Sequence, residues 1–91
     1  MNKYSVVVEG IFGVKGVMEL ALHKCAHKAP SLHREWMDRY GDRICGMSTD
    51  EYRMNVDEFI KEKGLRVVDA KPVARVEGDR YVVDVYCTVA W

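Results

Sequence analysis

The chain has 91 residues, 48% of them hydrophobic and 31% charged, and its 14 basic and 14 acidic side chains leave a formal net charge of zero. This length provides one small domain. The balanced charge argues against a nucleic-acid binder, which needs basic side chains to neutralise phosphates, and against attraction to an anionic membrane. With no apolar run of about 18–20 residues and three widely spaced cysteines, we expect a cytoplasmic protein without a membrane segment or disulfide framework.

The first two elements follow from a change in hydrophobic period. Residues 3–9 alternate and predict a strand with one face on a core, formed by Tyr4, Val6 and Val8. Helical spacing then predicts a helix over residues 17–28. Its apolar stripe consists of Met18, Ala21, Leu22 and Cys25, and its far side of Glu19, His23 and His27. We expect Cys25 to behave as a small buried hydrophobic residue.

A second helix is predicted to start at Pro30 and Ser31, because Ala29-Pro30-Ser31 breaks the first one. Its spacing places Leu32, Trp36 and Tyr40 on one face, and Gly41 is expected to end it in the left-handed conformation. The following residues 42–46 are irregular in pattern, with one further helical turn.

The clearest local signal is a capping box, Ser48-Thr49-Asp50-Glu51. The serine hydroxyl can accept a hydrogen bond from the amide of Glu51 at the start of a helix. The helix then carries a stripe of Tyr52, Val56, Phe59 and Ile60, and Gly64 provides its stop.

From Leu65 the hydrophobic period becomes two, and Gly78-Asp79 predicts a hairpin with a two-residue turn. Opposing Glu77 to Arg80 gives one almost wholly apolar face, with these pairs: Val76 with Tyr81, Ala74 with Val83, Ala70 with Cys87, and Val68 with Val89. The other face carries the charges, including Arg75 diagonal to Asp84. Pro72 makes residues 65–77 an edge strand or introduces a bulge.

The predicted fold is α+β in the order β-α-α-β-β, with a three-stranded antiparallel sheet and helices packed on one face. The outer sheet face is of mixed character, since it also carries Val7, Val73, Val82 and Tyr86. Such a face is either solvated or a dimer surface.

The glycine-rich segment Gly10-Ile11-Phe12-Gly13-Val14-Lys15-Gly16 lies where a strand leads into a helix. A phosphate-binding P-loop would need Gly-Lys followed by Ser or Thr, and the dinucleotide fingerprint would need G-x-G-x-x-G; neither is present. We therefore expect a tight reversal, with Ile11, Phe12 and Val14 either tucked under the domain or forming an exposed apolar tip that contacts another protein.

All three histidines lie within eleven residues. His23 and His27 are one helical turn apart and could chelate zinc together with His33 or Cys45, although Lys24 stands where H-E-x-x-H has its glutamate. Zinc binding is the alternative here, and the default interpretation is that these are solvated surface histidines.

The second helix carries Trp36, Arg39 and Tyr40, the residue types typical of binding hot spots, although core packing is the favoured explanation for the aromatic residues. No catalytic constellation is evident. The sequence therefore favours a small non-catalytic interaction module, an accessory, adaptor or inhibitor protein that contacts another protein and forms a homo-oligomer. A zinc- or small-ligand-binding domain is the alternative, and nucleic-acid binding ranks third.

Overall fold

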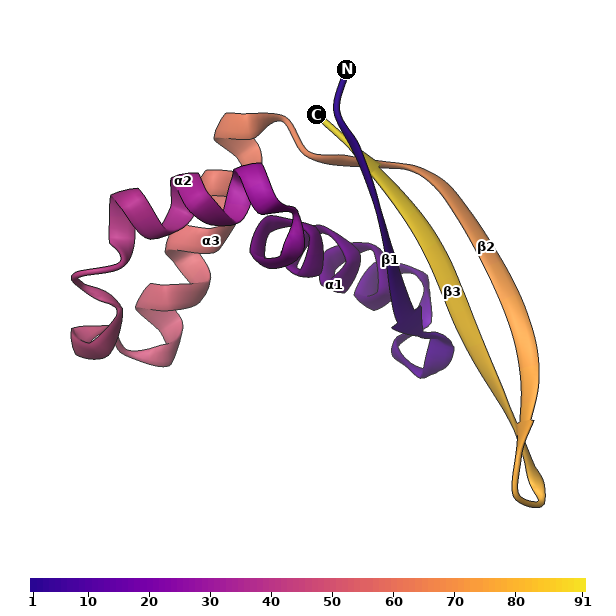
Figure 1. Cartoon of the computed structure of the whole chain (residues 1–91). Coiled ribbons are helices and arrows are strands. Elements are labelled where there is room, and N and C mark those ends of the chain that lie inside the picture. Colours follow the sequence, from indigo (N-terminus) through magenta and orange to yellow (C-terminus); the bar gives the residue numbers. More distant parts are fainter.

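The computed structural model describes residues 1–91, which form a three-stranded antiparallel sheet with three α-helices on one face (Figure 1). The strands run in the spatial order β1-β3-β2. Their bounds are β1 Lys3–Glu9, β2 Arg66–Glu77 and β3 Arg80–Ala90. The helices are α1 Gly13–Lys28, α2 Pro30–Tyr40 and α3 Thr49–Lys63, with short 3-10 helices η1 Gly10–Phe12 and η2 Ile44–Gly46. The predicted α+β class, strand order and one-sided helical layer are confirmed, and α1 and α2 are separate helices because Pro30 interrupts them.

Only α1 packs broadly on the sheet, where it contacts all three strands. The other two helices pack against α1 on its side away from the sheet, so the molecule has a sheet, one covering helix and then a helical pair (Figure 1). None of the helices combines the length and hydropathy that crossing a bilayer would need.

The helix ends agree with the predicted signals at both ends of α3, at the end of α1 and at the start of α2. The Ser48 hydroxyl accepts the amide of Glu51 at 3.2 Å, and Gly64 ends α3 at a φ of 69°. The predicted left-handed stop at Gly41 is wrong, because this residue has a φ of −52° and continues the helical turn. The start of α1 at Val17 was also placed too late. The glycine-rich segment is wound into η1 and the first turn of α1 rather than forming an open loop.

The predicted hairpin register is confirmed from the Gly78-Asp79 turn as far as the pair Ala70–Cys87. The predicted pair Val68–Val89 is wrong, because a bulge lies between Val67 and Asp69 and Val67 takes the place opposite Val89. The extra residue leaves Val68 exposed and turns Val67 toward the core. Pro72 lies in β2, which is an edge strand as predicted.

The core is centred on Trp36, which is 2% exposed. Its indole packs edge-on against Phe59, with ring centroids 5.7 Å apart, and against Tyr52 at the same distance. Cys25 and Cys87 are fully buried, as expected for Cys25, and burial raises the pKa of the Cys25 thiol to about 11. No charged or polar residue is buried in this core.

Candidate interaction surface

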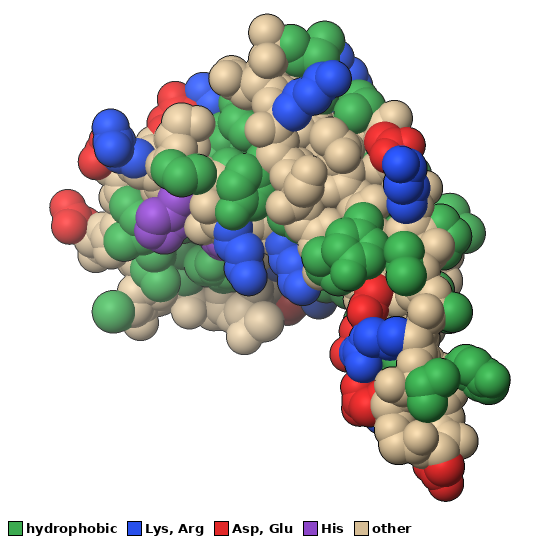
Figure 2. Space-filling model, turned by 45° about the vertical axis from the view of Figure 1, so that its right-hand side comes forward, with side chains coloured by type: hydrophobic (Ala, Val, Ile, Leu, Met, Phe, Trp, Pro, Cys, Tyr) green, Lys and Arg blue, Asp and Glu red, His purple; other side chains and the backbone are tan.

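The β2–β3 hairpin projects beyond the rest of the sheet (Figures 1 and 2). β1 ends at Glu9, opposite Asp84, whereas β2 and β3 continue for four further residue pairs to the turn. At about 3.3 Å per residue this projection is about 13 Å long. We call residues 74–83, which include the turn, the arm.

The inner face of the arm, on the side of the sheet that the helices cover, is apolar and uncovered. Tyr81 and Val83 lie on the same face as the buried Cys87, because alternate residues of a strand share a face. Tyr81 is nevertheless 82% exposed, and Val76 opposite it is 66% exposed. The helical layer stops where β1 stops. Beyond that point the apolar side chains on the inner face of the hairpin have no helix packed over them.

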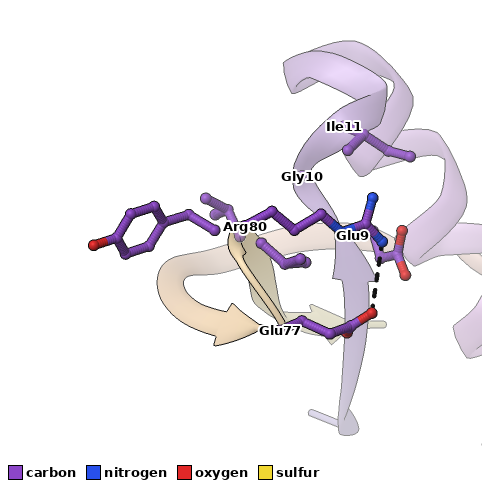
Figure 3. Close-up of a pocket in the computed structure, with 8 residues that line it drawn as sticks. Glu9, Gly10, Ile11, Glu77 and Arg80 are labelled. Atoms are coloured by element: carbon purple, nitrogen blue, oxygen red, sulfur yellow. Dashed lines mark ion pairs between the residues drawn. The ribbon is translucent and has the colours of Figure 1, made fainter.

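The turn after β1 adds a second group of exposed apolar side chains. Ile11 is 76% exposed and Val14 81% exposed, so of the two predicted arrangements the exposed tip is the one that forms. Ile11 and the arm line one open pocket of about 340 Å³, with Tyr81 and Val83 among its apolar walls and the Glu77–Arg80 ion pair at its rim (Figure 3).

Gly10 lets the turn approach the arm this closely. A Cβ atom at Gly10 would lie 3.2 Å from the carbonyl oxygen of Val83, which is tighter than ordinary contact. The turn and the arm therefore form one continuous surface, which we call the arm surface. It consists of Ile11, Val76, Tyr81 and Val83.

Phe12 faces a different part of the molecule, so the predicted tip is divided between two surfaces. Its side chain lines a shallow groove of about 950 Å³ between α1 and α3. Leu20, Ile60 and Leu65 contribute apolar walls to this groove.

Ion pairs hold the outer face of the arm. Arg75 donates through Nε to Asp84 at 2.6 Å across the hairpin, as its diagonal position predicted, and through Nη1 to Glu77 at 2.5 Å. The hydrogen bond from Arg75 lowers the pKa of the Glu77 carboxyl. These pairs link β2 to β3 along the projecting part, and they leave the opposite, apolar face free.

Both edges of the sheet carry features that discourage pairing with another strand. On the β1 edge, Lys24 Nζ donates to the Val7 carbonyl oxygen at 2.7 Å. On the β2 edge, Pro72 has no N–H to offer. These features protect the edges at β1 and β2, whereas the edge of β3 beyond Asp84, where β1 no longer pairs with it, carries neither of them.

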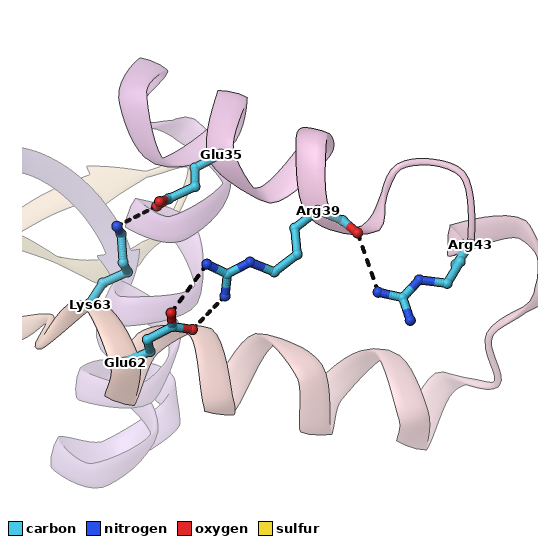
Figure 4. Close-up of polar contacts among 5 residues, drawn as sticks. All are labelled: Glu35, Arg39, Arg43, Glu62 and Lys63. Carbon is cyan, nitrogen blue, oxygen red and sulfur yellow. Dashed lines mark hydrogen bonds and ion pairs between the residues drawn. The ribbon is translucent and has the colours of Figure 1, made fainter.

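The predicted contact helix, α2, does not present its aromatic residues to solvent. Trp36 lies in the core, so its predicted place on an interaction surface is wrong, and Tyr40 is half-buried against it. Arg39 is held by α3: both of its terminal nitrogens donate to the Glu62 carboxylate, and its guanidinium lies 5.5 Å from the centre of the Phe59 ring (Figure 4).

A second ion pair, Lys63 with Glu35 at 2.5 Å, joins the same two helices (Figure 4). Arg43 Nη2 also donates to the Arg39 carbonyl oxygen at 3.3 Å. The polar side of α2 thus serves to attach α2 to α3. Core packing of Trp36, the interpretation that its sequence pattern favours, is the arrangement that forms.

The three histidine side chains do not meet at one site. His23 Nε2 lies 2.9 Å from Asp57 Oδ1, His27 Nε2 lies 3.1 Å from the Tyr52 hydroxyl, and His33 is exposed. His27 was predicted to be solvated, but it is half-buried because α3 packs over it. No group of three or more His, Cys, Asp or Glu side chains is arranged to hold a metal ion.

The sequence contains a signal for the arm that its analysis missed. β1 has seven residues, whereas β2 has twelve and β3 eleven. When the start of β1 pairs with the end of β3, β1 is too short to reach the hairpin turn, and part of the hairpin has no third strand beside it. Since β1 also determines how far α1 reaches along the sheet, the apolar residues beyond it are the ones that remain uncovered.

Comparison with known proteins identifies no relative of this chain: no family model, no curated protein and no solved structure matches it.

Proposed function

We propose that this chain is a small non-catalytic interaction module, which acts as an accessory, adaptor or inhibitor protein through protein–protein contacts, and that the arm surface makes those contacts. One observation carries the proposal. Large apolar side chains gather at one end of the molecule, where Ile11 is 76% exposed and Tyr81 82% exposed. A contiguous apolar patch of this kind on a small protein is typical of a binding site.

The chemistry of the patch suits a protein partner. Burial of apolar surface contributes about 25 cal/mol per Å², and a tyrosine adds a hydroxyl that can bond to a partner. The charged rim of the pocket is already paired, Glu77 with Arg80 at 3.5 Å, so a partner need not supply a counter-charge. Such an apolar centre with a polar rim is the usual organisation of a protein interface.

The arm can be tested with a matched pair of variants. Val76→Lys with Tyr81→Lys places two charges on the arm surface, whereas Tyr86→Lys places one on the outer face of the same strand, where Tyr86 is also exposed. Each protein is affinity-tagged, expressed in its own cells and recovered in native extract, and the size and protein content of its complex are measured.

The unmodified chain and Tyr86→Lys are expected to run as a complex larger than one chain. The arm variant is expected to run as a single chain with an unchanged unfolding curve, because the substituted residues are exposed. If the arm variant retains the same complex as the unmodified chain, the proposed role of the arm surface is wrong.

A further inference from the structure

We infer that the partner that covers the arm surface is a second copy of this chain, and that the two arms cross face to face about a two-fold axis. The inference rests on the proposed function, since it names the partner of the same surface. Three observations carry it: the amount of exposed surface, the charge of the chain and the geometry of the arm.

The exposed surface exceeds what one compact chain of this mass should have. The accessible surface is 6265 Å², whereas a compact monomer of 10.5 kDa exposes about 5,400 Å². The excess is roughly 800 Å², which is the area that each partner contributes to an interface of standard size. One dimer interface over the arm would bring the molecule to the surface expected of a compact protein.

The charge of the chain permits association with itself. Its formal net charge is zero, so two copies do not repel one another at long range. On the outer face of the arm, the two positive charges of Arg75 and Arg80 pair with the two negative charges of Glu77 and Asp84. A second copy therefore meets an apolar inner face, because these paired charges lie on the opposite face of the arm.

The geometry restricts how two arms can meet. α1 covers the inner face of the sheet where β1 is present, so a second arm can reach the free part only from the open end. Two arms that enter from opposite ends run antiparallel, with the two bodies pointing away from each other. Each body then stays clear of the other, whereas parallel arms would place both helical layers in the same space.

The faces are suited to such a crossing. Facing sheets pack about 10 Å apart with side chains interdigitated. The inner face of β2 contributes the small Ala74 beside Val76, and β3 contributes Tyr81 beside Val83. In the crossed arrangement Tyr81 of one copy lies beside Val83 of the second copy, and the tip of each arm reaches the Ile11 turn of the other. A two-fold contact of this kind closes on itself and stops at a dimer.

The experiment uses the purified full-length chain alone. Sedimentation equilibrium over a wide concentration range should give a monomer–dimer equilibrium. Tyr81→Lys should raise the dimer dissociation constant at least tenfold, as expected for a central aromatic residue, whereas Tyr86→Lys should leave it within about twofold. Either a monomer at every concentration or a dimer that is lost with Tyr86→Lys and kept with Tyr81→Lys would overturn the inference.

The arrangement itself is tested by filtered nuclear Overhauser spectroscopy on a mixture of isotope-labelled and unlabelled chains. Contacts between copies are expected from the Tyr81 ring to the methyl groups of Val83 and Ile11. Intermolecular contacts confined to Val7 or Tyr86 would place the interface on the outer face and contradict the crossed arms. Self-association is refuted if the purified chain is a monomer. The proposed function still stands if, in native extract, the unmodified chain retains a different protein and the arm variant does not.

Discussion

His27 stacks on Tyr52: the two rings are inclined by 10°, and His27 Nε2 lies 3.1 Å from the Tyr52 hydroxyl. The imidazole also meets Trp36 edge-on, with centroids 5.8 Å apart. A histidine from α1 thus takes part in the contact between all three helices. Burial lowers the pKa of His27, and the nearby His23 and His33 lower it further, so the folded chain favours the neutral ring.

We therefore predict that the chain becomes less stable as the pH falls below about 6.5, the ordinary value for histidine. Below that pH the unfolded chain binds a proton at His27, whereas His27 of the folded chain stays neutral until the pH reaches its own, lower pKa. Between these two pKa values protonation therefore favours the unfolded chain. The free energy of unfolding in urea should fall between pH 8 and pH 5. His27→Phe should reduce this dependence strongly, whereas His33→Gln should reduce it only slightly, because His33 is the smallest of the three causes that lower the His27 pKa. An unchanged pH dependence in His27→Phe would contradict the assignment.

Trp36→Ala should destabilise the fold by about 3–5 kcal/mol, because truncation of a fully buried aromatic residue removes its packing and leaves a cavity. Trp36 contacts Phe59 and Tyr52 of α3, so the loss separates the helical pair. Met37→Ala is the control, since Met37 is exposed on the same helix and should change stability by about 0.5 kcal/mol or less. Urea unfolding followed by far-ultraviolet circular dichroism measures both, and equal effects would show that Trp36 is not the centre of the core.

Pro72→Val should make the chain more prone to aggregate while its stability changes little. Asn2 and Trp91 exchange two backbone hydrogen bonds. In an antiparallel sheet, hydrogen-bonded pairs alternate with non-hydrogen-bonded pairs along two strands. The backbone groups of Val85 therefore bond to β1. Pro72, which lies opposite Val85, directs its backbone groups away from β3 to the free edge of β2. A residue with an N–H at this position completes the edge for pairing with another strand.

Light scattering during mild heating should therefore show several-fold faster aggregation for Pro72→Val. Val73→Thr, at the next position of the same strand, is the matched control because its backbone bonds toward β3. Aggregation rates that are the same in both variants and in the unmodified chain would mean that Pro72 does not protect the edge.

The local elements of this protein follow from its sequence, because their signals act over a few residues. The hydroxyl of Ser48 caps α3 and Gly64 ends it, as their spacing around the apolar stripe predicted. The Gly78-Asp79 turn sets the hairpin register, since a slip by one residue would move Arg75 and Asp84 to the apolar face of the sheet. The α+β class follows from these elements.

Only the tertiary structure decided which apolar residues are covered. Trp36 and Tyr81 are both aromatic residues on amphipathic elements, yet one is in the core and the other is 82% exposed. His27 likewise is half-buried only because α3 packs over α1. Hydrophobic period identifies the apolar side of an element, but whether a neighbour reaches that side depends on the relative lengths of elements distant in sequence. In this chain β1 and α1 end before the hairpin does, and that mismatch creates the arm.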